Sequence, residues 1–196
     1  MLYVLVGQSS TGKGTILNKL LNLDLGLEKL IYCTTRPMRV GEQEGIDYFF
    51  KTEEQYQQDL KSNKIIESRD YTRVDGLMHY YTLDNIDMSK DYIVDSSLWQ
   101  CQNYIKAWGS FVKPIHVVVD DYTRLTRAIE REKNNKQDYK EVCRRFNDEF
   151  VEYSEENWKS IDFWLTVENK DLDTCVSAIK EAIKPSEDVL FSFFDK

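Results

Sequence analysis

Residues 2–15 read LYVLVGQSSTGKGT, and this stretch decides the fold. The apolar run 2–6 predicts a buried strand, and the pattern G-x-x-x-x-G-K follows at Gly7, Gly12 and Lys13. Glycines let a backbone turn tightly and aim successive N–H groups at phosphate oxygens, while a lysine adds a mobile positive charge. Apolar residues at helical spacing come next, and a helix N-terminus favours an anion. The sequence therefore predicts a loop for the phosphates of a nucleotide, made by Gly7, Ser9, Ser10, Thr11, Gly12, Lys13, Gly14 and Thr15.

Strand-like and helix-like stretches alternate along the rest of the chain. Short apolar, β-branched or aromatic runs are typical of fully buried parallel strands, and they occur at 92–95, 115–119 and 163–167. Apolar residues at helical spacing lie between and after them, most extensively over 139–153. Alternation of this kind predicts an α/β fold with a parallel sheet and flanking helices.

One segment breaks this alternation. Between residues 30 and about 83, several short strand-like pieces surround a single helical pattern at 53–60. This composition predicts a small, mostly antiparallel β insertion beside the main sheet, where a second substrate can bind. Because no Pro/Gly/Ser-rich linker divides the chain, we expect a single domain.

The composition limits the class of protein. Hydrophobic residues make up 41% of the 196 residues, which favours a packed core. The formal charge of −8 argues against non-specific binding to nucleic acid or to a membrane. No apolar run approaches the roughly 18 residues of a membrane helix, and the N-terminus lacks a signal peptide's layout. Four widely spaced cysteines form no C-x-x-C pair, so we expect free thiols and a cytoplasmic protein.

A second candidate anion site lies at 34–50, which reads TTRPMRVGEQEGIDYFF. Arg36 and Arg39 offer planar donors that match phosphate oxygens, and the hydroxyl of Tyr48 can add a contact. Taken alone, these arginines are equally consistent with a solvated charge pair. The segment closely resembles the hallmark T-T-R-x-x-R-x-G-E-x-x-G-x-D-Y-x-F of guanylate kinases, and the phosphate loop lies at the family's distance upstream.

The resemblance extends over nearly the whole chain and implies a P-loop NTPase-like fold. It implies ATP-dependent phosphorylation of GMP or dGMP to GDP or dGDP with Mg²⁺, by a monomer or homodimer without nucleic-acid or membrane partners. We expect the single domain to comprise core segments at about 1–31, 84–120 and 158–184, an acceptor-binding insertion at about 32–83, a helical lid at about 121–157 and a C-terminal tail at 185–196.

The resemblance also implies roles for residues of the acceptor site. In the family, two arginines and a tyrosine bind the phosphate of GMP, and Arg36, Arg39 and Tyr48 match them. A family glutamate accepts hydrogen bonds from the guanine edge, and Glu67 matches it. The second of two tandem tyrosines, Tyr81, is expected to contact the phosphate. The expected acceptor site is therefore Arg36, Arg39, Tyr48, Glu67, Tyr81 and Ser97.

Arg131 and Arg145 match the family's two lid arginines, which neutralise charge on the transferring phosphoryl group. Asn169 lies in a segment that resembles the one beside the adenine of ATP. The expected catalytic residues are Lys13, Arg36, Arg131 and Arg145.

The metal site departs from the strict loop pattern. The residue after Lys13 is Gly14 instead of Ser or Thr, so the usual hydroxyl for Mg²⁺ is missing there. Thr15 and Asp95 remain as candidate ligands, directly or through water. The nucleotide's own phosphates can supply most of the coordination, because Mg²⁺ gives up its water reluctantly.

Three positions that the family uses to read guanine do not match. Tyr32 replaces a serine, Leu83 replaces the Ser or Thr that follows the tandem tyrosines, and Ser97 replaces an aspartate. Losing a hydrogen bond to a charged partner costs on the order of 1.5–3 kcal/mol, so weaker GMP binding is expected. Two alternatives stay open: a nucleoside monophosphate kinase or related kinase with altered acceptor specificity, and a non-catalytic guanylate-kinase-like module that binds proteins.

Overall fold

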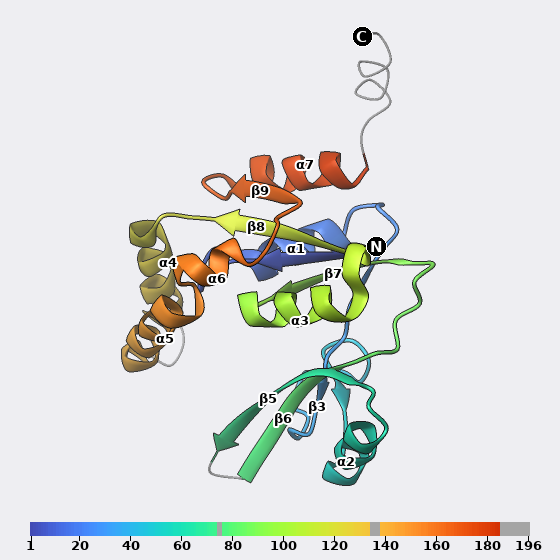
Figure 1. Ribbon diagram of the computed structural model, residues 1–196. Coiled ribbons are helices and arrows are strands. Elements are labelled where there is room, and N and C mark those ends of the chain that lie inside the picture. Colours follow the sequence, from blue (N-terminus) through green and yellow to red (C-terminus); the bar gives the residue numbers. More distant parts are fainter. Residues whose placement is uncertain (74–75, 134–137, 185–196) are drawn as a thin grey trace.

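The computed structural model describes residues 1–73, 76–133 and 138–184. A sheet of five strands forms its centre, in the order β2-β7-β1-β8-β9, and every neighbouring pair is parallel (Figure 1). The predicted α/β fold with a parallel sheet is therefore confirmed. The strands are β1 (Leu2–Val6), β2 (Leu27–Lys29), β7 (Asp91–Ser96), β8 (Val112–Val118) and β9 (Leu165–Glu168).

Helices cover both faces of this sheet, because alternate side chains of the buried strand β1 point to opposite sides. Tyr3 and Leu5 pack in a core cluster with α1 and α7. Leu2, Val4 and Val6 pack in a second cluster with α3 and with aromatic side chains around α6. The bounds are α1 (Lys13–Leu21), α3 (Leu98–Trp108), the 3₁₀ turn η1 (Gly109–Phe111), α6 (Glu155–Lys159) and α7 (Leu172–Ile183).

The insertion forms a second sheet below the core in Figure 1, in the order β4-β3-β6-β5. The pairs β3–β6 and β5–β6 are antiparallel and β3–β4 is parallel, so the sheet is mostly antiparallel, as predicted. Thr52 caps α2 in a capping box with Gln55. The elements are β3 (Cys33–Thr34), β4 (Phe49–Phe50), α2 (Glu53–Lys61), β5 (Ile65–Arg73) and β6 (Gly76–Leu83).

Two further helices, α4 (Asp121–Lys133) and α5 (Tyr139–Glu152), stand beyond the carboxyl ends of the core strands (Figure 1). We call this pair the lid helices. The loops after β1, β7, β8 and β9 open at the same edge of the sheet, which is where parallel α/β sheets bind ligands. The predicted C-terminal tail, 185–196, lies outside the described residues.

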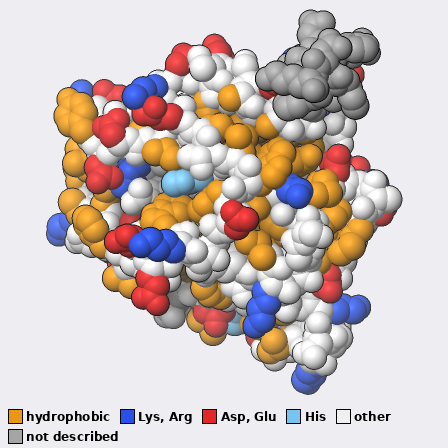
Figure 2. Space-filling model, turned by 45° about the horizontal axis from the view of Figure 1, so that its top comes forward, with side chains coloured by type: hydrophobic (Ala, Val, Ile, Leu, Met, Phe, Trp, Pro, Cys, Tyr) orange, Lys and Arg blue, Asp and Glu red, His pale blue; other side chains and the backbone are white. Residues whose placement is uncertain are grey.

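Side chains of both charge signs are interspersed over the face drawn in Figure 2. Among the described residues, no helix combines the length and the apolar character required to cross a bilayer.

Candidate active site

The loop at 7–12 joins β1 to α1, and its two glycines are required by geometry. A Cβ on Gly7 would lie 2.6 Å from the carbonyl oxygen of Val117. Gly12 has φ +90°, and a Cβ there would lie 2.5 Å from Nδ2 of Asn169. Gly12 is also the N-cap of α1, and no side chain caps this helix. The first N–H groups of α1 therefore remain available to an anion.

Lys13 begins α1 and folds back over the loop. Its Nζ donates to the carbonyl oxygens of Gly7 and Gln8, at 2.5 and 3.0 Å. Burial lowers the pKa of the Lys13 amine, and the carboxylates of Asp95 and Glu149 oppose that shift. The amine thus lies in a poorly solvated position, where its attraction for a phosphate is weakly screened.

A cavity of about 570 Å³ opens beside the loop and the first turn of α1. Lys13 and Thr15 line it from the loop side, and Asp95 lines it from the end of β7. Arg131 and Arg145 line it from the lid helices. The structure therefore brings these five predicted residues together around one space, which we call the loop cavity.

Asn169 follows β9 and braces the loop from behind. Its Nδ2 donates to the carbonyl oxygen of Thr11 at 2.7 Å, and its own carbonyl oxygen accepts from Arg127 at 3.0 Å. The side chain is buried, and its Oδ1 has no partner among the described residues. Asn169 therefore lies against the phosphate loop, and its expected place beside the adenine stays a prediction.

A buried ion pair, which the motifs did not single out, joins the lid helices to the loop. Nη1 of Arg124 donates to Oε2 of Glu149 at 2.8 Å and to the carbonyl oxygen of Ser9 at 3.1 Å. The backbone N–H of Ser9 donates to the other oxygen of Glu149. One turn further along α5, the hydroxyl of Tyr153 donates to the carbonyl oxygen of Gly7 at 3.0 Å. The lid helices thus hold the loop backbone directly.

Arg36 lies in the insertion and is nearly buried. Its two terminal nitrogens donate to the two oxygens of Glu42, both at 2.8 Å, and its Nε donates to the hydroxyl of Tyr80 at 3.1 Å. The guanidinium also lies over the ring of Tyr48, 5.3 Å from its centroid. This pairing lowers the pKa of Glu42 to about 2. Arg39 is exposed, and its backbone N–H donates to Glu42 at 2.7 Å.

The structure contradicts the expectation that Tyr81 contacts the acceptor phosphate. Tyr81 is fully buried in the core of the insertion, and its hydroxyl donates to Asp59 at 3.0 Å. Neighbouring residues of a strand point to opposite faces. Tyr80 therefore points the other way, towards Arg36, and it is the tyrosine of this pair that reaches the site.

The structure also corrects the expectation that Leu83 removes a hydroxyl from the base pocket. Glu67 pairs with Thr82 across β5 and β6, after a register shift between Ile65 and Glu67. The hydroxyl of Thr82 donates to Oε1 of Glu67 at 2.6 Å and lies 3.0 Å from the hydroxyl of Tyr104. Glu67 therefore keeps a hydroxyl partner, one residue earlier in the sequence than the motif predicts.

The other two unmatched positions are occupied by side chains whose hydroxyls are already engaged. The hydroxyl of Tyr32 donates to the carbonyl oxygen of Asp95 at 2.8 Å. Ser97 is the N-cap of α3, where its Oγ accepts from the N–H of Gln100 at 3.3 Å. The same Oγ accepts a hydrogen bond from Arg69.

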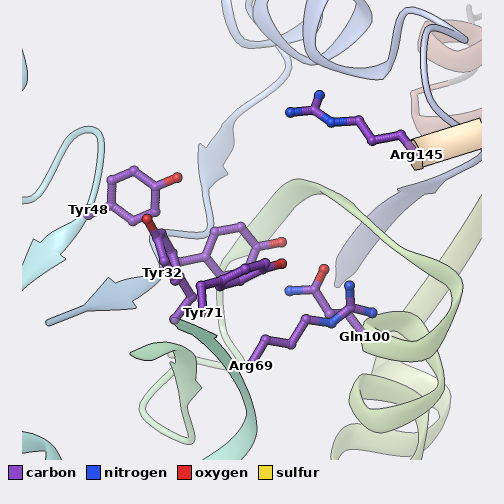
Figure 3. Close-up of a pocket in the computed structure, with 7 residues that line it drawn as sticks. Tyr32, Tyr48, Arg69, Tyr71, Gln100 and Arg145 are labelled. Carbon is purple, nitrogen blue, oxygen red and sulfur yellow. The ribbon is translucent and has the colours of Figure 1, made fainter. Parts of the chain in front are cut away.

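A second cavity, of about 340 Å³, lies between the insertion and the lid (Figure 3). We call it the acceptor cavity. Tyrosine side chains gather on one side of it, the side chains of Arg69 and Gln100 lie together on another, and Arg145 reaches in from α5. Its lining residues are Tyr32, Tyr48, Arg69, Tyr71, Tyr80, Gln100 and Arg145.

A family model described as guanylate kinase matches residues 1–186. The chain belongs to the guanylate kinase family. It is 28% identical over 193 residues to a guanylate kinase of Rickettsia felis, which covers 97% of this chain and 96% of that protein. It is 27% identical over 184 residues to one of Caldanaerobacter subterraneus subsp. tengcongensis, which covers 93% and 86%. It shares a fold with the crystal structure of guanylate kinase from Anaplasma phagocytophilum, with a TM-score of 0.59 and 21% sequence identity. That comparison covers 94% of this chain and 84% of the other.

A shorter match gives a higher identity. A guanylate kinase of Shouchella clausii is 36% identical over 96 residues, which is 48% of this chain and 47% of that protein.

Several residues of this guanylate kinase site escaped the motif analysis. Glu42 stands within the hallmark segment, but its pairing with Arg36 is visible only in three dimensions. Arg69 follows Glu67 by two residues on β5 and therefore shares its face, and this spacing was the only signal for it. Glu149 was detectable as a charge that interrupts the apolar stripe of α5.

The residues near the loop fit a magnesium ion that is held mainly by phosphates and water. Thr15 lies in the first turn of α1, and Asp95 Oδ2 is 4.0 Å from where a Cβ of Gly14 would stand. Among the described residues, no three His, Cys, Asp or Glu side chains group to hold a metal. The chain thus offers one carboxylate and one hydroxyl, which suits an ion that keeps several waters.

Proposed function

We propose that the protein transfers the γ-phosphoryl group of ATP to the phosphate of GMP or dGMP. One observation carries the proposal: Arg145 lines both the loop cavity and the acceptor cavity. The loop cavity has the amides and the lysine of a triphosphate site, and the acceptor cavity is lined by Tyr48 and Tyr80, which Arg36 contacts from behind. Two anion sites that share a cation are what a direct transfer between two phosphates requires.

The reaction needs little from the protein beyond position and charge. The acceptor phosphate is already an anion, so no strong general base is required. Lys13 and the first amides of α1 hold the phosphates of ATP, and Arg36 with Tyr48 and Tyr80 holds the acceptor phosphate. Arg145 lies where it can neutralise charge on the group in transit, and closure of the lid strengthens that effect by excluding water.

Arg131 lines the loop cavity but not the acceptor cavity, and we assign it to the phosphates of ATP. Asp95 and Thr15 would hold Mg²⁺ through water, and the ion would neutralise phosphate charge during transfer. The division into core, acceptor insertion and lid belongs to this proposal, as does the cytoplasmic setting. The expectation that the protein is a monomer or a homodimer stays a prediction.

The test is a coupled assay of ADP release with Mg-ATP and a panel of acceptors: GMP, dGMP, AMP, CMP, UMP and dTMP. We expect turnover with GMP and dGMP, and loss of that turnover in Lys13→Met. Lys19→Met is the matched control, because this lysine lies on the same helix but pairs with Asp173 on the surface. Absence of turnover with every acceptor would refute the proposal, and it would favour a protein-binding module.

A further inference from the structure

Behind Gln100, at the wall of the acceptor cavity, lies the buried carboxylate of Glu67, and one of its oxygens has no described partner. Glu67 is 4% exposed. Its Oε1 already accepts from Thr82 at 2.6 Å and lies 3.4 Å from Nε2 of Gln100, a residue that lines the cavity. Its Oε2 has no partner among the described residues. A carboxylate oxygen accepts about two hydrogen bonds, so Oε1 is filled and Oε2 is the unpaired acceptor of this buried carboxylate.

Beside this acceptor lies a guanidinium that none of the motifs assigned. Arg69 shares the face of β5 with Glu67 and lines the cavity next to Gln100 (Figure 3). Its hydrogen bonds to Ser97 and to Glu152 both use Nη2, so Nη1 and Nε can still donate to a ligand. The guanidinium also stacks over the ring of Trp99, 4.8 Å from its centroid, which fixes its plane.

These two groups select one hydrogen-bonding pattern on a base. The free oxygen of Glu67 needs an N–H donor, and the guanidinium of Arg69 needs carbonyl or ring-nitrogen acceptors. A 6-oxopurine has both, with N1–H beside O6 and N7. Adenine presents the reverse pattern, because its N1 is an acceptor and its exocyclic amine would face the guanidinium. The hydroxyl of Tyr32 donates to the carbonyl oxygen of Asp95, and Ser97 does not line this cavity, so neither competes with Arg69 for the base.

We propose that Arg69 determines base specificity by donating to the O6 side of a 6-oxopurine, while Oε2 of Glu67 accepts its N1–H. The inference rests on the proposed kinase function and adds a residue that selects its acceptor base.

The experiment compares kcat/KM for GMP and AMP in the wild type and in Arg69→Met, with Mg-ATP. The wild type should prefer GMP to AMP. A bidentate arginine contact to a base is worth about 1–3 kcal/mol, so Arg69→Met should lower the GMP-to-AMP ratio by roughly 5- to 150-fold. Lys64→Met, at an exposed lysine beside β5 that does not line the cavity, should leave the ratio unchanged.

The outcomes separate this inference from the function on which it rests. A wild type that phosphorylates none of the nucleotides refutes both. A wild type that phosphorylates GMP, while Arg69→Met keeps the same GMP-to-AMP ratio, overturns the role of Arg69 and leaves the kinase function standing. If Arg69→Met does not fold, Arg69→Lys serves instead: it keeps the charge beside Glu152 but not the planar fork, and the ratio should fall in the same direction.

Discussion

Replacing Arg124 by methionine removes one half of a buried ion pair. The side chains of Arg124 and Glu149 are only 3% and 9% exposed, and their closest atoms are 2.8 Å apart. Without the guanidinium, Glu149 stays buried with only the backbone N–H of Ser9 as its described partner. Truncating one member of such a pair costs about 3–5 kcal/mol, mostly because the remaining charge is left uncompensated. For a chain of this length, that loss corresponds to a fall in Tm of roughly 6–20 °C.

Chemical denaturation of single and double variants measures this loss and the coupling within the pair. We expect Arg124→Met to lower the free energy of unfolding by about 3–5 kcal/mol. Adding Glu149→Gln should recover part of that loss, because it removes the charge that is left without a partner. Arg144→Met is the control, since this arginine is 58% exposed and its ion pairs on α5 should contribute less than about 1 kcal/mol.

Two results would refute the reasoning. One is an Arg124→Met protein that is as stable as the Arg144→Met control. The other is a double variant whose loss equals the sum of the two single losses, because independent effects add and coupled ones do not.

Three further predictions concern the site and its supports. Tyr80→Phe should raise the KM for GMP about two- to tenfold with little change in the free energy of unfolding. Tyr81→Phe should lower the free energy of unfolding by about 1 kcal/mol and leave that KM unchanged. The reverse pattern would support Tyr81 as the phosphate-binding tyrosine. Gly7→Ala should cost about 1–3 kcal/mol, because its Cβ would lie 2.6 Å from a carbonyl oxygen, while Gly14→Ala should be neutral or stabilising in the same denaturation assay. Glu42 has a pKa lowered from 4.5 to about 2, so its stabilising effect is complete above pH 4.5 and is lost as pH falls towards 2. The stability difference between the wild type and Glu42→Gln should therefore shrink over that range, and a constant difference would contradict the ion pair with Arg36.

The elements that carry the phosphate loop could be predicted from the sequence because their signals are local. A buried strand, two constrained glycines and an amphipathic helix follow one another directly, and no distant contact is needed to recognise them. The helix α3 carried a comparable signal at Leu98, Cys101, Tyr104 and Trp108, which are buried at helical spacing. The strand β2 did not, because only one of its three residues is apolar.

The errors at Tyr81 and Leu83 have one physical cause. Strand residues alternate between faces, so a shift of one residue exchanges every inward side chain for an outward one. Thr82 lies opposite Glu67 and Tyr80 opposite Arg69, so these alternate residues of β6 share one face. A motif read as letters cannot tell which set of alternate residues faces the site. The hydrogen bond from Thr82 to Glu67 shows which set does.

Burial separates the arginines of the lid helices into two groups. Arg124 is 3% exposed and holds the loop backbone, while Arg145 is 50% exposed and faces both cavities. The buried arginine pairs with the buried carboxylate of Glu149 and with Asp121 on its own helix, whereas the exposed one shares Glu141 with Arg144 on the surface of α5. A surface ion pair contributes little, so a phosphate can replace it at small cost. The buried pair of Arg124 and Glu149 therefore fixes the phosphate loop, whereas the weakly paired Arg145 can exchange its carboxylate for the phosphates of the substrates.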